Sequence, residues 1–228
     1  MVPRLLGMVL RWTALGPMAL LVQAMAIEFW IGLRDSGVGY SSLAHPLALA
    51  FLGGILLRVM IRTGLRRLGR SDPLDFVDTL EHELTHALMG YLTLAPPISL
   101  SATLQSGGEV QLKGANPLAA LAPYFLPLWG LCAVLVGLVV RPGMQAAWNA
   151  LVFFLLGAFA YRLSREFHWR QSDLHRYGFL FSLLAVPTLL LACLGIILHA
   201  RGVLSWHWLT GVWPRFRESV EWLVNRGR

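Results

Sequence analysis

The sequence has few charged residues. They make up 14% of its 228 residues, compared with roughly a quarter in ordinary soluble domains, whereas 56% of the residues are hydrophobic. A single aqueous core could not bury this much apolar sequence, and several apolar runs approach or exceed the about 20 residues that cross a bilayer. The composition excludes a soluble enzyme, a disordered tail and a secreted disulfide scaffold. It predicts an integral multi-pass membrane protein.

Cysteine is also scarce, and both cysteines, Cys132 and Cys193, lie inside apolar runs. We interpret them as small residues facing lipid or core, with no bearing on redox compartment. The formal net charge of +7 would suggest nucleic-acid binding in a soluble chain. Here the arginines border apolar runs without interleaved aromatic residues, which is typical of membrane-flanking charge. We therefore expect the lipid bilayer, and no nucleic acid, among the partners.

Windows of about 19 residues predict six membrane spans. The spans are Trp12–Leu33, Ala44–Ile61, Leu74–Leu94, Leu118–Val140, Met144–Leu163 and Tyr177–Ala200. We expect an all-α polytopic membrane protein in three segments. Residues 1–72 form two N-terminal spans and a basic loop, and residues 73–200 form a core. Residues 201–228 carry four tryptophans among arginines, which is typical of an amphipathic interfacial helix.

One polar stretch between the spans has the pattern of a small β-hairpin. Apolar and polar residues alternate from Ile98 to Lys113, and the pair Gly107–Gly108 interrupts the alternation. This pattern predicts two short strands and a turn. Open sheet edges are not stable against lipid, so we expect the hairpin to be interfacial, or re-entrant and buried in protein or a wet cavity.

The third predicted span contains an HExxH motif, in which His82 and His86 flank Glu83. Residues i and i+4 share one face of a helix, so both imidazoles can bind one Zn²⁺, and Glu83 can act as general base. The Asp-Pro pair at residues 72 and 73 is a good start for this helix. Ionisable residues inside a membrane span are costly unless hydrated or paired, so by default they indicate a functional site.

A catalytic zinc usually takes three protein ligands and a water, so a third ligand is needed. The polar stretch after the fifth predicted span offers four candidates: Asp173, Glu166, His168 and His175. For Glu166 we favour a different role: it forms an ordinary ion pair with a neighbouring arginine at the end of its helix.

Three features together resemble the site-2 protease family of intramembrane zinc metallopeptidases. They are HExxH on a membrane helix, a glycine-containing hairpin directly downstream, and an acidic residue after two further spans. The resemblance covers about residues 74–178. It implies that the third ligand is an Asp, and the matching position is Asp173, which here stands in Gln-Ser-Asp-Leu instead of Leu-Asp-Gly. The family's activity would be zinc-dependent hydrolysis of membrane-anchored protein substrates, with one Zn²⁺ held by His82, His86 and Asp173.

The resemblance also implies that the hairpin holds an unwound substrate segment by β-augmentation. The candidate substrate-binding residues are Ile98, Leu100, Ala102 and Leu104; a simple interfacial lid is the alternative role. Two other functions stay open. One is an HtpX-like membrane metallopeptidase that uses Glu166 as third ligand, and the other is an inactive scaffold that binds membrane helices without cutting them.

The orientation in the membrane stays open, because two arguments disagree. Arginines are most frequent on the side of the N-terminus, which the positive-inside rule places in the cytoplasm. The resemblance places the hairpin and third ligand toward the cytoplasm, and both fall on the opposite side of the predicted topology. As the location we expect the plasma membrane, which in bacteria is the inner membrane.

Two polar residues outside the motif have structural interpretations. Glu28, a lone carboxylate in the first span, is either a gate or a paired structural group. Asn116 precedes a proline, a sequence typical of a helix N-cap.

Overall fold

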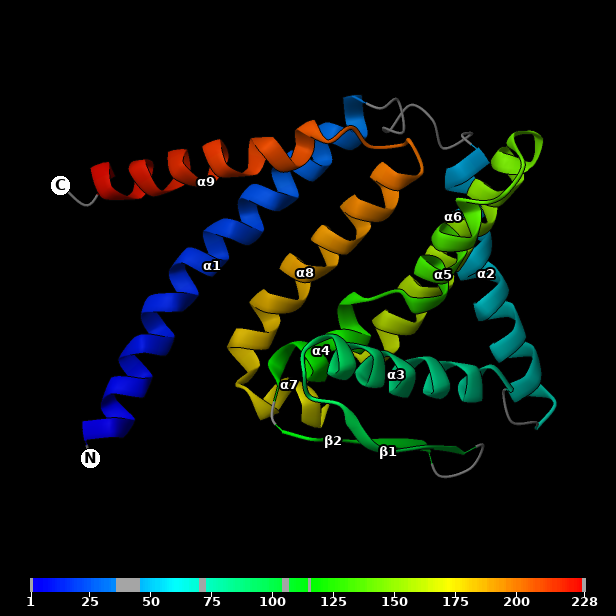
Figure 1. The fold of residues 1–228 in the computed structure, drawn as a ribbon, viewed down its shortest axis with the longest axis horizontal. Coiled ribbons are helices and arrows are strands. Elements are labelled where there is room, and N and C mark those ends of the chain that lie inside the picture. Colours follow the sequence, from blue (N-terminus) through cyan, green and yellow to red (C-terminus); the bar gives the residue numbers. More distant parts are fainter. Residues whose placement is uncertain (1, 36–45, 70–72, 104–106, 115, 227–228) are drawn as a thin grey trace. The chain divides into compact units, whose positions relative to one another are not determined.

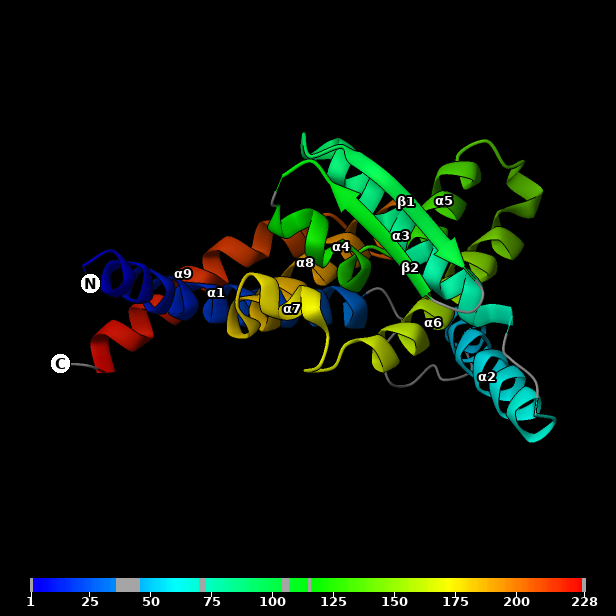
Figure 2. The same ribbon diagram turned by 90° about the horizontal axis from the view of Figure 1, so that it is seen from below.

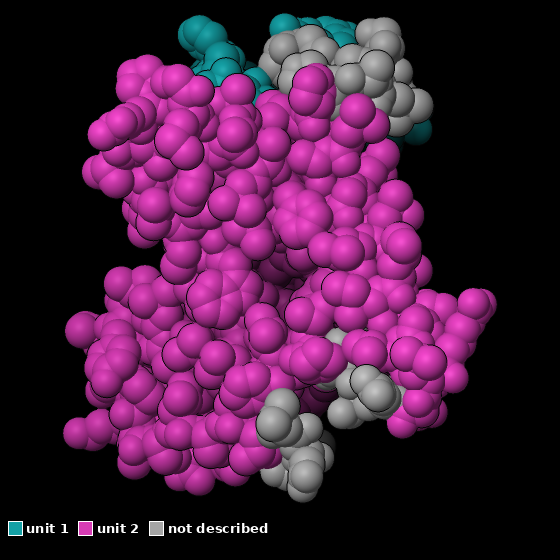
Figure 3. Space-filling view, turned by 90° about the vertical axis from the view of Figure 1, so that its right-hand side faces the viewer, with its two compact units in different colours: residues 1–42, 174–228 teal, residues 43–173 magenta. Residues whose placement is uncertain are grey.

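The computed structural model describes residues 2–35, 46–69, 73–103, 107–114 and 116–226. These residues are mostly helical, with one two-stranded antiparallel sheet among them (Figure 1). The chain divides into two compact units, which Figure 3 shows in different colours. Unit 1 comprises residues 1–42 and 174–228, and unit 2 comprises residues 43–173. These units cut across the three segments expected from the sequence.

Unit 1 is built from three long helices, α1 (Val2–Asp35), α8 (Phe179–Ala200) and α9 (His207–Arg226). The indole of Trp208 on α9 is 2% exposed because two glycines make room for it. A Cβ added at Gly195 would lie 1.9 Å from Trp208 Cζ2, and one added at Gly32 would lie 3.2 Å from Trp208 Cβ. The expected C-terminal helix is therefore present, and this tryptophan packs inside unit 1.

Glu28 on α1 is a paired group. Its Oε1 lies 3.0 Å from Nε of Arg215 on α9. A Cβ at Gly211 would lie 2.2 Å from Glu28 Oε2, so a glycine on α9 lets the carboxylate lie against this helix. Of the two interpretations of Glu28, the structure favours the structural ion pair.

Unit 2 contains the hairpin and the HExxH helix. Its elements are α2 (Pro46–Arg67), α3 (Pro73–Leu92), β1 (Pro97–Thr103), β2 (Gly107–Leu112), α4 (Pro117–Phe125), α5 (Leu128–Gly137), the 3₁₀ turn Pro142–Met144 and α6 (Gln145–Glu166). The short helix α7 (Ser172–Arg176) begins at the end of this unit. The helix carrying HExxH does start at Pro73; the predicted N-cap, Asp72, lies outside the described residues. Asn116 is the expected N-cap of α4, with Oδ1 accepting from the backbone of Leu118 and Ala119.

Four helices in the described parts of the chain are long and apolar enough to cross a membrane. They are Leu15–Asp35, Pro46–Arg67, Pro142–Glu166 and Phe179–Ala200. The helices α4 and α5 would make a fifth span only as a broken one, because they bend by 76° where they meet. Six spans are not shown, since α3 carries four acidic residues within 20. The structure thus supports a membrane protein with fewer regular spans than the sequence predicts.

The helix that carries Glu166, α6, packs closely against α2. A Cβ at Gly54 would lie 2.0 Å from the carbonyl oxygen of Phe154, and one at Gly157 would lie 1.9 Å from that of Phe51. Small residues that let two backbones approach are typical of helix contacts in membranes. The two helices run side by side in Figures 1 and 2.

Ion pairs hold the polar start of α3 against its neighbours. Asp78, which is buried, pairs with Arg58 of α2. Asp75 lies 2.8 Å from Arg62 Nη1 on α2 and 3.5 Å from Arg165 Nη1 on α6. A buried carboxylate needs such a partner to remain charged. The acidic residues of α3 thus connect it to both helices.

The predicted β-hairpin is confirmed, and it lies along α3 (Figure 2). Leu100 pairs with Val110 and Ala102 with Gly108, whereas the register shifts at Ile98. Paired residues of an antiparallel sheet present their side chains on one face. Gly108 contacts α3, so this face is the one turned toward the HExxH helix.

Candidate metal centre

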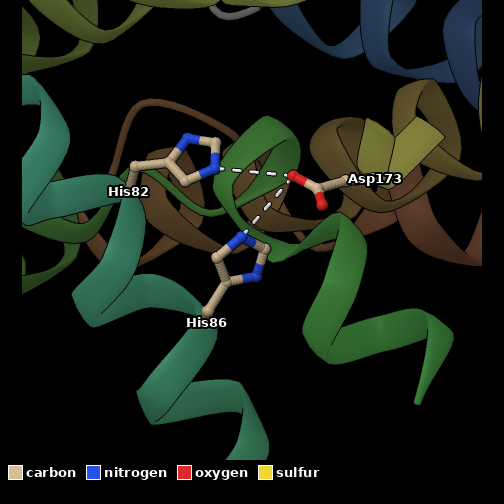
Figure 4. A group of neighbouring side chains, drawn as sticks. All are labelled: His82, His86 and Asp173. Atoms are coloured by element: carbon tan, nitrogen blue, oxygen red, sulfur yellow. Dashed lines mark ion pairs between the residues drawn. The ribbon is translucent and has the colours of Figure 1, made fainter. Parts of the chain in front are cut away.

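Three side chains of unit 2 converge on one point (Figure 4). His82 and His86 lie one turn apart on α3, and Asp173 lies at the start of α7. Asp173 Oδ2 is 3.6 Å from His82 Nε2 and 3.7 Å from His86 Nε2. Ligands at about 2.0 to 2.1 Å from a tetrahedral zinc are separated by about 3.3 Å. The observed spacing is longer than a hydrogen bond and close to that of ligands sharing one ion.

The far nitrogen of each ring has its own partner. His82 Nδ1 lies 3.1 Å from Glu166 Oε2, and His86 Nδ1 lies 2.7 Å from the carbonyl oxygen of Ala119. Carboxylate and carbonyl oxygens only accept, so both Nδ1 atoms donate. In a neutral ring this leaves the lone pair on Nε2, which is the tautomer that binds metals.

Three electron-pair donors therefore face one another. The two Nε2 lone pairs and a carboxylate oxygen of Asp173 repel unless a positive charge lies among them. That charge can be a proton on a ring or a metal ion. The ligand atoms lie within 4.8 Å of one another, so His82, His86 and Asp173 could hold a metal ion.

The surroundings of Asp173 favour the ionised form of its carboxyl group, which is the form that binds a metal ion. Burial by itself would raise its pKa, but the interactions with His82 and His86 outweigh burial and hold the pKa below its ordinary value. The hydroxyl of Tyr124 on α4 donates to the same Oδ2 at 3.3 Å. Tyr124 is fully buried and lies within an apolar stretch, so no motif in the sequence indicates its role.

Glu83 is 8% exposed and lies beneath the hairpin. A Cβ at Gly108 of β2 would lie 2.4 Å from Glu83 Cγ and 2.8 Å from its Oε1. A potential general base thus lies beside the ligand cluster, with a strand passing directly over it.

The other candidate ligands lie elsewhere. Glu166 contacts the far nitrogen of His82, and it also forms the expected ion pair, with Arg162 Nη1 at 3.0 Å. His168 Nδ1 accepts from the backbone of Arg170 at 3.2 Å, and the His175 ring stacks on Phe179. Within the described part of the chain, Asp173 is the acidic residue that shares the group with both histidines.

The expected substrate-binding residues differ in their placement. Ala102 and Leu100 lie on the face of the hairpin turned toward α3, since their partners are Gly108 and Val110. Ile98 lies at the register shift and is 69% exposed. Leu104 is outside the described residues. The strand beside Glu83 is β2, so β1 contributes less directly to this side of the site.

Comparisons with protein-family models, with curated proteins and with solved structures found no match for this chain. The metal site therefore rests on the chain's own residues, and it is the convergence of His82, His86 and Asp173 that defines it.

Proposed function

We propose that the protein is an intramembrane zinc metalloprotease, similar to site-2 proteases, that hydrolyses peptide bonds of membrane-anchored proteins. One observation carries the proposal. Two imidazoles, each held by an acceptor at Nδ1, direct Nε2 toward the carboxylate of Asp173. The helices long and apolar enough to cross a membrane support the location of this chemistry in a bilayer, which we propose is a plasma membrane, in bacteria the inner membrane.

The donor set fits zinc. Two nitrogens and one carboxylate oxygen are typical of catalytic zinc sites, which keep a further position open for water or substrate. Zinc bound here would supply Lewis acidity, polarising the scissile carbonyl and lowering the pKa of the attacking water.

Glu83 performs the proton transfers in this proposal. Its carboxylate accepts a proton as water adds to the carbonyl carbon, and it returns that proton to the amine nitrogen as the C–N bond breaks. One water is consumed, and a new carboxyl and a new amine are formed. The buried position of Glu83 beneath Gly108 keeps bulk solvent from competing with the substrate for this group.

The hairpin suits a substrate in extended conformation. A transmembrane helix bonds its own carbonyls internally, so the segment to be cleaved must unwind first. The sheet among the described residues has two strands, so each strand has one edge whose backbone groups pair with no third strand there. A substrate segment added at an edge would pair with these groups, and β2 would bring it over Glu83.

The test is cleavage of a panel of single-span membrane peptides by the purified, zinc-loaded protein in detergent. We expect wild type to cleave at least one peptide and Glu83→Gln to keep its zinc but lose about 10²- to 10⁴-fold in rate, the usual contribution of a general base. Glu218→Gln is the matched control, because Glu218 is exposed on α9. Cleavage by Glu83→Gln at the wild-type rate, or a panel left intact by wild type, would contradict the proposal.

A further inference from the structure

A chain of charged groups runs behind the metal centre within unit 2. Glu81 Oε2 lies 3.3 Å from Arg162 Nε, and Arg162 Nη1 lies 3.0 Å from Glu166 Oε2. The same Glu166 oxygen lies 3.1 Å from His82 Nδ1. A side chain on α6 is thereby connected to a ligand on α3 that is 84 residues away in sequence.

We infer that Glu166, held by Arg162, is a positioning residue for His82 that strengthens the binding of the metal ion. The inference rests on the proposed function and adds the residues that prepare its site. This role explains why the Glu166 carboxylate contacts the candidate ligand His82 without facing the metal site itself.

The side chain of Arg162 is buried and has several contacts. Its side chain is 1% exposed, Nη2 donates to the carbonyl oxygen of Pro123 at 3.3 Å, and the guanidinium lies over the Phe159 ring, 5.1 Å from its centroid. A guanidinium fixed on three sides holds the carboxylate that it binds in one place. Glu166 thus presents its oxygen to His82 from a fixed position.

The charge count indicates a role beyond neutralising Arg162. The carboxyl of Glu81, which is 4% exposed, also lies against this guanidinium. With both carboxyls ionised, the group of three carries one net negative charge. The imidazole of His82 contacts the Glu166 carboxylate of this group. When Nε2 binds a cation, the ring becomes more positive, and its attraction to this carboxylate increases.

The two histidines differ in their support. His86 Nδ1 donates to the neutral carbonyl of Ala119, whereas His82 Nδ1 donates to a carboxylate. A hydrogen bond to a charged acceptor is stronger, and it makes the opposite nitrogen more basic. His82 is therefore the better electron donor of the pair, and Glu166 is the residue responsible.

The test measures zinc affinity by chelator competition in the purified full-length protein. We expect Glu166→Leu to lower the affinity by about 10- to 100-fold, the usual effect of losing such a partner. Glu166→Gln keeps an acceptor without the charge, so its affinity should fall between those of Glu166→Leu and wild type. The matched control is Glu221→Gln, because Glu221 also has an arginine four residues earlier but is 65% exposed.

Two further measurements separate positioning from stability. The visible spectrum of the cobalt-substituted protein should change in both Glu166 variants and remain unchanged in the control. The midpoint temperature of thermal unfolding, measured without metal, should be nearly the same for Glu166→Gln and wild type. If Glu166→Leu does not fold because Arg162 has lost a partner, the nearly isosteric Glu166→Gln carries the test.

The outcomes distinguish this inference from the function on which it rests. Wild-type protein that binds zinc and cleaves, together with Glu166→Gln of unchanged zinc affinity and cobalt spectrum, would overturn the positioning role alone. Wild-type protein that binds no zinc would overturn both.

Discussion

At the scale of single residues, each side chain of the candidate metal site has a partner that fixes its direction. The partner of His82 is Glu166, that of His86 is the Ala119 carbonyl, and that of Asp173 is the Tyr124 hydroxyl. Such partners orient ligands and tune their basicity. The candidate metal site is therefore formed by six groups on four helices and not by the HExxH motif alone.

The contact between Tyr124 and Asp173 gives a prediction at this scale. Tyr124→Phe removes one hydrogen bond to a charged oxygen, so we expect zinc affinity to fall by about 10- to 150-fold, from the 1.5 to 3 kcal/mol typical of such bonds. The matched control is Tyr177→Phe, because the Tyr177 hydroxyl has no hydrogen-bond partner in the described part of the chain. Equal zinc affinity in Tyr124→Phe and the control would show that the hydroxyl does not support the ligand.

Sequence alone can identify some of these residues. The i, i+4 spacing of His82 and His86 with Glu83 between them is a local pattern, and a local pattern can be recognised without knowledge of the fold. Asp173 could be named only through a family resemblance. The contact of Glu166 with His82 could not be predicted, because an Arg and a Glu four residues apart on a helix look the same whether or not a third group is beside them.

At the scale of elements, α3 is not a simple apolar helix. Asp75, Asp78 and Glu81 recur every third residue on it and pair with arginines of α2 and α6. Hydropathy recognises the apolar residues of α3 but not its ion pairs, so the sequence predicts a span where the structure has a helix held by charge. The bend between α4 and α5 was missed for a similar reason, since the apolar run is continuous through Pro127.

The closeness of β2 and α3 gives a prediction for the hairpin. Gly108→Ala would bring a methyl group into Glu83, so either the strand or the carboxylate must shift. We expect the peptide-cleavage rate to fall by about 10²-fold, as for misplacement of a catalytic group by about 1 Å, with zinc retained. Gly143→Ala, at a site with no atom within 4 Å of the added group, should leave the rate unchanged. Wild-type cleavage by Gly108→Ala would show that β2 does not constrain Glu83.

At the scale of the whole molecule, the candidate metal ligands and their partners all belong to unit 2. Unit 1 contributes two of the candidate membrane helices and the packed C-terminal helix. The sequence indicates the tryptophans of this helix but not which one is buried, because that depends on glycines at positions 32 and 195 in two other helices.

The division into units predicts that loosening α9 leaves metal binding intact. Trp208→Ala removes a side chain that is 2% exposed, and such changes cost about 3 to 5 kcal/mol. We expect faster limited proteolysis at residues 201–206, next to α9, with unchanged zinc content. Trp222→Ala is the control, because Trp222 is 54% exposed. Loss of zinc in Trp208→Ala would show that the site depends on the packing of unit 1.

In the proposed function, His82, His86 and Asp173 together hold one zinc ion. The most direct test of this proposal is the metal content of the purified, detergent-solubilised protein, measured for wild type, Asp173→Ala and the exposed-site control Asp35→Ala. We expect about one zinc per chain in wild type and in the control, as for a single site with three protein ligands, and little or none in Asp173→Ala. Wild-type protein without zinc, or undiminished zinc in Asp173→Ala, would contradict it.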